Sequence, residues 1–215
     1  MSVLAVIPAR AGSKSLPGKN WKEFCGKPLV AWTIEQALLA KLVDRVVVST
    51  DSPEVAEAAN GYGVYVKGRP PELATDEAPT EAVLNQVLRN NISADLVVLL
   101  QPTSPLRTPK DIDECVERVQ EAAEKDWDVS VTSAVWNHWE AEFPCRDRKR
   151  RQDIARLMEN GAIYATTRKA LLENNNRVAK GAWPYPMPRW TRFEIDEADD
   201  FAVCEMLFRE HGLDK

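Results

Sequence analysis

Continuous apolar runs alternate with helical patterns along the first half of this chain, and that alternation restricts the folds open to it. Residues 3–6, 46–48 and Leu96–Leu100 are short runs of aliphatic side chains. A strand that is apolar on both faces is typical of a parallel sheet covered on both sides. Between these runs, apolar side chains recur at helical spacing, as over positions 30–38 and 80–88. The sequence therefore predicts an α/β fold with a mainly parallel sheet flanked by helices.

Further boundaries can be placed along the second half. Thr108 followed by Pro109 is typical of a helix N-cap and a first helical position, and an apolar face continues over 112–123. We expect a strand over 161–167 and a closing helix over 199–209. No internal repeat or low-complexity linker interrupts the pattern.

The bulk composition fits one globular domain over residues 1–215. The net charge is −5 and the pI is about 5.3, which argues against a dedicated nucleic-acid binder. No apolar run reaches the length of a membrane span, and the N-terminus has no signal-peptide layout, so we expect no membrane partner. The cysteines are far apart and form no C-x-x-C pair, which favours a reducing cytoplasm over disulfides or a zinc site. They are Cys25, Cys115, Cys145 and Cys204.

A basic loop follows the first apolar run. Residues 7–20 read IPARAGSKSLPGKN and place Arg10, Lys14 and Lys19 among Gly12, Ser13 and Gly18. Glycine allows the backbone N–H groups to approach an anion, while Arg supplies a planar fork and Lys a point charge. The loop therefore predicts a polyphosphate site, which indicates a nucleotide.

This loop is not a Walker A motif. Five residues separate Gly12 from Gly18 where that motif has four, and Asn20 replaces the hydroxyl residue that would bind Mg²⁺. Pro17 also removes a backbone donor from the loop. A P-loop NTPase is a poor match, and the simpler alternative is a basic surface loop that binds nothing.

Polar clusters follow two later strands. Ser49, Thr50 and Asp51 follow the second run, and residues 101–107 follow the third. Ligands of open parallel sheets bind beyond the carboxyl ends of the strands, so these clusters and the basic loop should meet in one crevice. Ordinary turn chemistry is the alternative for Ser49, Thr50 and Asp51. For Gln101 we favour binding, because its amide both donates and accepts hydrogen bonds.

Two carboxylates near the C-terminus suggest a metal site. If residues 193–197 form a strand, Glu194 and Asp196 lie on the same face. Two such carboxylates beside a phosphate loop can hold Mg²⁺ together with substrate phosphates. The alternative is that this acidic segment caps the closing helix, a role that we expect for Asp199 and Asp200.

Residues 136–158 do not fit the rhythm of strands and helices. The segment contains Trp136, Trp139, Phe143 and a dense basic run that ends at Arg151. We predict an extended dimerisation arm that buries its aromatic side chains against a second copy of the chain. Most of the basic run is expected to be a solvated face, with Arg151 as the exception that reaches an anionic ligand.

Seven motifs occur in order over nearly the whole chain: IPARAGSKSLPGKN (7–20), VSTD (48–51), RPPELATD (69–76), LQPTSPLR (100–107), RRQD (150–153), ENGAIYAT (159–166) and EIDEADDF (194–201). Together they resemble the acylneuraminate cytidylyltransferase family, the CMP-sialic acid synthetases. The resemblance implies a Rossmann-like nucleotidyltransferase fold and a homodimer in which an arm reaches the neighbouring active site. It implies an enzyme that joins CTP to a nine-carbon 2-keto sugar acid with Mg²⁺, giving a CMP-sugar and pyrophosphate.

The residue pattern and the resemblance together assign the site. The residues expected to bind the nucleotide are Arg10, Gly12, Ser13, Lys14, Lys19, Asn20, Arg69 and Thr80. Those expected to contact the sugar acid are Gln101, Thr103, Ser104 and Arg151. Asp196 matches the principal metal carboxylate, and Glu194 stands where many members have Asp. The residues expected to carry the chemistry are Arg10, Lys14, Lys19, Arg151 and Asp196.

This chemistry requires positioning and charge neutralisation rather than a protein nucleophile, which suits a chain with two histidines. The sequence is also compatible with other substrates and with another function. The acceptor is a sialic, legionaminic, pseudaminic or Kdo-like acid, or the donor is another nucleoside triphosphate. A non-catalytic nucleotide-binding module is the non-enzyme alternative, against which the Glu194 and Asp196 pair argues.

Overall fold

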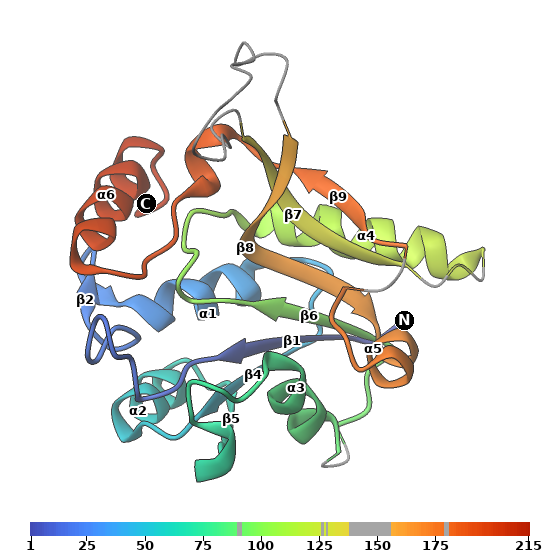
Figure 1. Cartoon of the computed structure of the whole chain (residues 1–215), viewed down its shortest axis with the longest axis horizontal. Coiled ribbons are helices and arrows are strands. Elements are labelled where there is room, and N and C mark those ends of the chain that lie inside the picture. Colours follow the sequence, from blue (N-terminus) through green and yellow to red (C-terminus); the bar gives the residue numbers. More distant parts are fainter. Residues whose placement is uncertain (90–91, 126, 128, 138–155, 179–180) are drawn as a thin grey trace, which may run out of the picture.

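The computed structural model describes residues 1–89, 92–125, 127, 129–137, 156–178 and 181–215. Its centre is a seven-stranded sheet with the strand order β5-β4-β1-β6-β8-β7-β9 (Figure 1). The first four strands of this order are parallel, β8 is antiparallel to both of its neighbours, and β9 is parallel to β7. The strands are β1 (Val3–Pro8), β4 (Arg45–Thr50), β5 (Tyr65–Gly68), β6 (Leu96–Leu100), β7 (Ser130–Asn137), β8 (Arg156–Thr167) and β9 (Trp183–Pro186).

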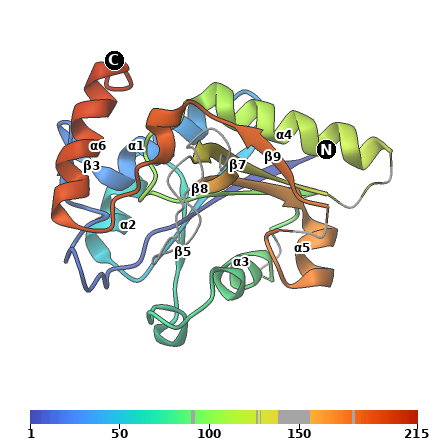
Figure 2. The ribbon, with the colours of Figure 1, turned by 45° about the horizontal axis from the view of Figure 1, so that its top comes forward.

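Helices cover both faces of this sheet. The helices are α1 (Leu29–Leu39), α2 (Pro53–Gly61), α3 (Thr80–Leu88), α4 (Pro109–Glu124), α5 (Arg168–Asn174) and α6 (Ala198–Glu210), with 3₁₀ turns η1 (Pro71–Leu73) and η3 (Arg189–Arg192). Figure 2 shows α1 and α4 on one side of the sheet and α3 and α5 on the other. The expected mainly parallel sheet flanked by helices is confirmed.

The alternation of side chains along β1 explains why both faces are covered. Ala5 and Ile7 point into one core with α1, α2 and α4, whereas Leu4 and Val6 point into a second core with α3 and α5. All four side chains are fully buried. A strand that supplies apolar side chains to two cores is what a continuous apolar run produces.

A third apolar cluster fixes the C-terminal helix beside the phosphate loop. Phe24, in the small hairpin of β2 (Glu23–Phe24) and β3 (Lys27–Pro28), packs edge-to-face against Phe201 and Phe208 of α6, with ring centroids 5.3 and 5.1 Å apart. Such aromatic contacts orient rings as well as bury them. The acidic segment that leads into α6 is therefore held near the loop that precedes the hairpin.

One boundary differs from the sequence-based expectation, and one strand was not predicted. The helix at Thr108 begins as predicted, with the Thr108 hydroxyl accepting the Asp111 N–H. The strand expected over 161–167 begins earlier, at Arg156, and pairs with β7, which was not predicted. The two described ends of the expected arm thus belong to a β-ladder, in which Trp136 lies opposite Leu157.

The rest of that arm, including Arg151, lies outside the described residues. Among the helices that the structure describes, none combines the length and the apolar character that a membrane span requires.

Candidate active site

A cavity of about 310 Å³ opens at the carboxyl ends of β1 and β6. It collects most of the residues that the sequence assigned to ligand binding. They are Arg10, Gly12, Ser13, Lys19, Asn20, Arg69, Thr80, Gln101, Thr103, Glu194 and Asp196. The basic loop and the turn after β6 therefore meet in one crevice as predicted, whereas Ser49, Thr50 and Asp51 are not among the residues that line it.

Three assigned residues are not among those lining the cavity. The Lys14 side chain is 83 % exposed, and Ser104 is buried beneath the surface. Arg151 lies outside the described residues.

A larger cavity, of about 620 Å³, lies at the opposite ends of the strands. Its lining is mainly apolar, with Asp44 and Arg45 as charged members. Both charged residues bind backbone groups of the chain itself, since Asp44 accepts the Val3 N–H and Arg45 donates to the Ser93 carbonyl. The smaller polar cavity is the candidate active site.

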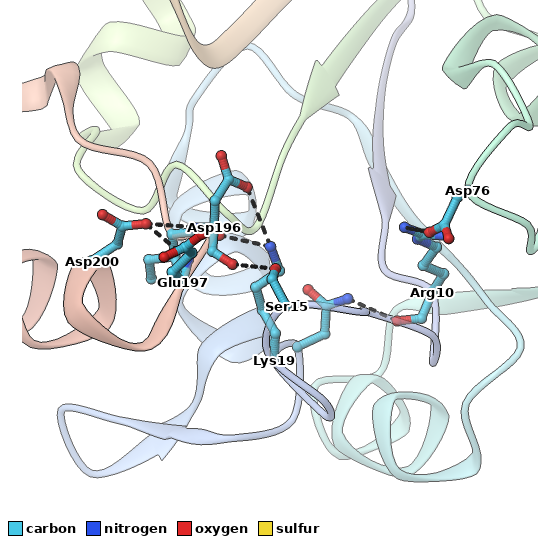
Figure 3. A network of polar contacts seen from close by, with 9 residues as sticks. Arg10, Ser15, Lys19, Asp76, Asp196, Glu197 and Asp200 are labelled. Atoms are coloured by element: carbon cyan, nitrogen blue, oxygen red, sulfur yellow. Dashed lines mark hydrogen bonds and ion pairs between the residues drawn. The ribbon is translucent and has the colours of Figure 1, made fainter.

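The basic loop is held by contacts to the acidic segment, by a contact within the loop and by a contact to Asp51. Lys19 is buried, and its Nζ donates to the Ile195 carbonyl at 2.7 Å and lies 3.5 Å from Asp196 Oδ1 (Figure 3). Asn20 Nδ2 donates to the Arg10 carbonyl at 2.9 Å, and Asp51 accepts the Ala11 N–H at 2.8 Å. Asn20 and Asp51 therefore set the path of the loop.

Gly18 shows why glycine is needed in this loop. Its φ is +73°, and a Cβ at this position would lie 2.9 Å from the ring of Trp21. A side chain here would be strained and would displace the residues around Lys19.

Arg10 and Lys14 share one carboxylate. Arg10 Nη2 lies 2.5 Å from Asp76 Oδ1, and Lys14 Nζ lies 2.6 Å from Asp76 Oδ2. The hydrogen bonds from Lys14 and Arg10 lower the pKa of the Asp76 carboxyl. Sequence reasoning placed Asp76 in the RPPELATD motif but gave it no role.

Arg69 is a second buried cation at this end of the cavity. It donates through Nη2 to the Ser49 carbonyl at 2.9 Å and through Nε to the Ser49 hydroxyl at 3.3 Å. Burial lowers the pKa of Arg69 to about 10, although the charge of Asp51 opposes this shift. Ser49 and Asp51 thus hold the cavity-lining groups in place and are not in its lining.

The turn after β6 is held by an arginine that sequence reasoning missed. Arg107 is fully buried and donates to the carbonyls of Gln101 and Ser104 at 3.0 and 2.5 Å, and to the Thr33 hydroxyl at 2.7 Å. Burial lowers the pKa of Arg107 to about 9, with Asp111 partly opposing the shift. The signal was present in the motif LQPTSPLR, whose last residue is a charge between apolar neighbours and a helix cap.

The acidic segment is not a strand, which corrects the sequence-based expectation. Residues 193–197 form an irregular extended link between η3 and α6. Ile195 is fully buried and donates its N–H to the Thr103 carbonyl at 2.7 Å. Glu194 and Asp196, on either side of it, line the same cavity. The predicted common face is therefore observed, but side-chain burial at Ile195 produces it instead of sheet pairing.

Further contacts orient Asp196. The Ser15 hydroxyl donates to the Asp196 carbonyl at 2.5 Å, and Asp200 Oδ2 accepts the N–H groups of Asp196 and Glu197 at 3.1 and 2.8 Å (Figure 3). Asp200 therefore caps α6 as expected. The Asp196 carboxylate takes no part in this cap and is 75 % exposed.

The Glu194 carboxyl has a raised pKa in the cavity. Burial and the charge of Asp196 raise the pKa of Glu194 to about 7, while Lys19 and the Ser104 hydroxyl oppose the shift. Its carboxylate lies against the backbone of Gly161, where a Cβ would come within 2.7 Å of it. Gly161, with a φ of +70°, is a second supporting residue that sequence reasoning missed.

The donor set fits a hard divalent cation. Two carboxylates on one side of a cavity repel each other unless a cation or a proton lies between them. Among the residues that the structure describes, no group of three or more His, Cys, Asp or Glu side chains gathers to hold a metal. One or two carboxylates, completed by water and substrate phosphates, is the arrangement that Mg²⁺ prefers in nucleotide sites.

Comparison with known proteins places these features in a family. Residues 4–188 match the family model described as Cytidylyltransferase. The chain is 35 % identical to the CMP-N,N'-diacetyllegionaminic acid synthase of Legionella pneumophila, over 96 % of each chain. It is 31 % identical to the N-acylneuraminate cytidylyltransferase of Escherichia coli, over 99 % of this chain and 54 % of that protein. The chain therefore spans nearly all of the first relative and about half of the second.

Solved structures support the same fold. The CMP:2-keto-3-deoxy-manno-octonic acid synthetase complexed with CTP superposes with a TM-score of 0.74 at 20 % identity, covering 98 % of this chain and 100 % of that one. The 4-diphosphocytidyl-2C-methyl-D-erythritol synthase of Anaerococcus prevotii gives a TM-score of 0.65 at 14 % identity, covering 97 % of this chain and 96 % of that one. At these identities the likeness concerns the fold.

Proposed function

Because the chain belongs to the cytidylyltransferase family, we propose that it is an enzyme that transfers the cytidylyl group of CTP to a nine-carbon 2-keto sugar acid and releases pyrophosphate. The family membership bears out the resemblance drawn from the seven motifs. One observation carries the proposal: a single polar cavity holds the buried cation Lys19, the carboxylates Glu194 and Asp196, and Gln101 at the end of β6.

The nucleotide is assigned to the end of the cavity that contains the basic loop and Arg69. The backbone of Gly12 and Ser13 and the side chains of Arg10, Lys14 and Lys19 bind the triphosphate. Arg69, Asn20 and Thr80 complete this end around the nucleoside. These groups neutralise the charge of the pyrophosphate as it leaves.

The sugar acid is assigned to the turn after β6. Gln101 and Thr103 line the cavity and offer donors and acceptors to a polyhydroxylated acid. Ser104 supports the site through Glu194 and does not contact the sugar acid, because it is buried beside the segment that carries Glu194. Arg151 is assigned to the substrate carboxylate, which it would bind in a bidentate way.

Asp196 and Glu194 are the residues that would hold Mg²⁺. When bound, the ion supplies charge neutralisation and polarisation at the α-phosphate. Lys19 supports this arrangement because it holds the Ile195 carbonyl between the two carboxylates. The acceptor hydroxyl attacks the α-phosphate in line with the pyrophosphate, so that the new O–P bond forms as the bond from the α-phosphorus to the pyrophosphate oxygen breaks and the hydroxyl proton is lost to solvent. Positioning of both substrates in one cavity lowers the barrier, because the step becomes effectively unimolecular.

A legionaminic-type acid is the second candidate acceptor. One relative, the synthase named for N,N'-diacetyllegionaminic acid, matches this chain over 96 % of each protein. The N-acylneuraminate cytidylyltransferases match at similar identity but are about twice as long. The 35 % identity to this synthase supports including a legionaminic-type acid in the substrate panel.

The functional unit is proposed to be a homodimer with residues 136–158 as the shared arm. Trp136, at the described end of that segment, is 51 % exposed. A large exposed aromatic side chain is typical of a surface that is buried by a partner. A reducing cytoplasm is proposed as the compartment, which suits the free thiols of Cys25, Cys115 and Cys204.

Subunit complementation tests the shared arm. Arg151→Ala and Lys19→Ala should each be inactive alone, and mixed dimers should recover activity because one of their two sites carries neither change. Lys41→Ala, which changes an exposed lysine that does not line the cavity, serves as the mixing control. An active monomer by sedimentation would exclude the homodimer, and inactive mixed dimers would place Arg151 in the site of its own chain.

A substrate panel tests the proposed reaction. Pyrophosphate release is measured with each of the four common nucleoside triphosphates against sialic, legionaminic, pseudaminic and Kdo-type acids. We expect turnover with CTP and a nine-carbon acid, and no turnover with CTP alone. Release with a different nucleotide or with an eight-carbon acid alone would replace this assignment, and no turnover with any pair would favour a binding module.

A further inference from the structure

The phosphate-binding cations in this structure already face an internal anion. Both oxygens of the Asp76 carboxylate are engaged, one by Arg10 and the other by Lys14, at 2.5 and 2.6 Å. A phosphate group offers the same pair of cations the same type of acceptor. Asp76 therefore occupies the place where a nucleotide phosphate would bind these two side chains.

Among the described residues, the polar contacts of Asp76 itself are these two ion pairs, and the segment around it has few others. It begins at Arg69, whose N–H donates to the Thr50 carbonyl, and it ends at α3. Among the described residues, the backbone at positions 75–78 makes no hydrogen bond to another part of the chain. Asp76 can thus leave the two cations without breaking a strand or a helix.

Asp76 also belongs to the site itself. It lines the polar cavity together with Thr75 and Ala78 of the same segment, opposite the carboxylates of Glu194 and Asp196. Figure 3 shows the Arg10 and Asp76 pair apart from the group around Lys19 and Asp196. A ligand that reaches Arg10 must therefore compete with Asp76, whereas one that stays near Lys19 need not.

We propose that Asp76 is a displaceable internal anion that weakens the binding of the triphosphate and promotes the release of pyrophosphate. The inference rests on the proposed function, since it assigns Arg10 and Lys14 to the phosphates of CTP. CTP replaces the carboxylate on both cations when it binds. After transfer, Asp76 returns to them as the pyrophosphate leaves, so the product does not remain on an unopposed pair of cations.

This competition makes Asp76 a determinant of selectivity. Displacement of the carboxylate lowers the affinity for every ligand whose phosphates bind Arg10 and Lys14. The affinity for cytidine is not lowered, because cytidine has no phosphate. Asp76 therefore narrows the difference in affinity between the triphosphate and the bare nucleoside, and its removal should widen that difference.

Calorimetric binding to Asp76→Asn tests the proposal. Dissociation constants are measured for CTP, inorganic tripolyphosphate and cytidine, without sugar acid. We expect CTP and tripolyphosphate to bind about fivefold more tightly than to the wild type, the size expected for two partly exposed ion pairs. Cytidine should bind the wild type and the variant equally.

Glu77→Gln is the matched control, because it removes the same charge from the adjacent residue. Glu77 is exposed and makes no ion pair among the described residues. An equal gain in affinity for tripolyphosphate in both variants would show that the loss of one negative charge near the site explains the effect. That result would overturn the proposal. Weaker binding of tripolyphosphate to Asp76→Asn would also overturn it, since Asp76 would then support the site.

Steady-state inhibition by pyrophosphate provides the second readout. The inhibition constant for pyrophosphate should fall in Asp76→Asn by a factor similar to the gain in affinity for tripolyphosphate, and an unchanged constant would contradict the role in release. The binding experiment uses tripolyphosphate, so it remains decisive if no sugar acid supports turnover. Failure of the proposed function would appear in the substrate panel, and failure of this inference in the binding of polyphosphate.

Discussion

At one end of the cavity, Arg10 and Lys14 face the opposite charge of Asp76, whereas at the other end Glu194 faces the like charge of Asp196. The first arrangement lowers the pKa of Asp76, and the second raises the pKa of Glu194 to about 7. Among the described residues, one carboxylate thus faces two cations at the cationic end, and one cation, Lys19, faces two carboxylates at the acidic end. A ligand that carries both a polyanionic part and a cation could place the polyanion against Arg10 and Lys14 and the cation against Glu194 and Asp196.

Removal of the Asp196 carboxylate should cause the largest loss of activity. We expect Asp196→Asn to keep its fold and to lose activity on the order of several hundredfold, by analogy with the loss of one preorganised electrostatic group. Glu194→Gln should cost less if Asp196 is the principal ligand. Turnover is measured at limiting Mg²⁺.

Asp199→Asn is the control for that experiment, because it removes the same charge from the exposed first turn of α6. It should retain the activity of the wild type. Turnover of Asp196→Asn at the same rate would remove Asp196 from the metal site.

Crowding of the Glu194 carboxylate should have the next largest effect. In Gly161→Ala the new methyl group would lie 2.7 Å from Glu194 Oε1, so the carboxylate must move. We expect a loss of activity on the order of tenfold to a hundredfold, typical of a misplacement of about 1 Å. Activity and the melting temperature are both measured.

Gly63→Ala separates this effect from backbone strain. Gly63 has a φ of +69°, close to that of Gly161, but its Cβ would meet nothing within 4 Å. Both variants should lose about 1–2 kcal/mol of stability because L-residues disfavour this conformation. An equal loss of activity in the two variants would show that the contact with Glu194 is irrelevant.

The repulsion at the acidic end predicts a smaller effect on stability. The pKa of Glu194 is raised in the folded state, so the fold favours the protonated form, and stability is lost as the pH rises from the ordinary carboxyl range to about 7. Without metal at pH 8, Glu194→Gln should therefore be more stable than the wild type by about 1–2 kcal/mol, after a discount for partial exposure.

Thermal melts across pH check this expectation. The advantage of Glu194→Gln should disappear below the ordinary pKa of a glutamate, where the wild-type side chain is protonated in both states. Saturating Mg²⁺ should reduce the advantage at pH 8. A variant that is less stable than the wild type at pH 8 without metal would contradict the repulsion.

The same two ends differ in how far the sequence predicts them. The basic loop is local, because its cations, glycines and strand lie within residues 3–20, and its position at the end of β1 is confirmed. The acidic segment depends on contacts that are distant in sequence, such as Ile195 with Thr103 and Glu194 with Gly161. Its common face was predicted, but its strand conformation was wrong.

The sheet shows a similar division. The parallel strands β1, β4 and β6 were predicted because their continuous apolar runs are distinctive. The strand β7 mixes small and polar residues, and β9 contains two prolines in WPYP, which weakens any strand pattern at an edge. Arg107 escaped notice because its role depends on backbone carbonyls that surround it only in the folded chain.

The dependence of CTP affinity on Mg²⁺, compared between the wild type and Asp196→Asn, tests most directly whether one ligand joins the two ends. Titration calorimetry at rising Mg²⁺ gives the dissociation constant of CTP for each protein. We expect Mg²⁺ to tighten the binding of CTP to the wild type by about tenfold or more and to leave the affinity of Asp196→Asn for CTP nearly unchanged. The same dependence on Mg²⁺ in both proteins would contradict the account, because the ion would then act on CTP without the carboxylates of this chain.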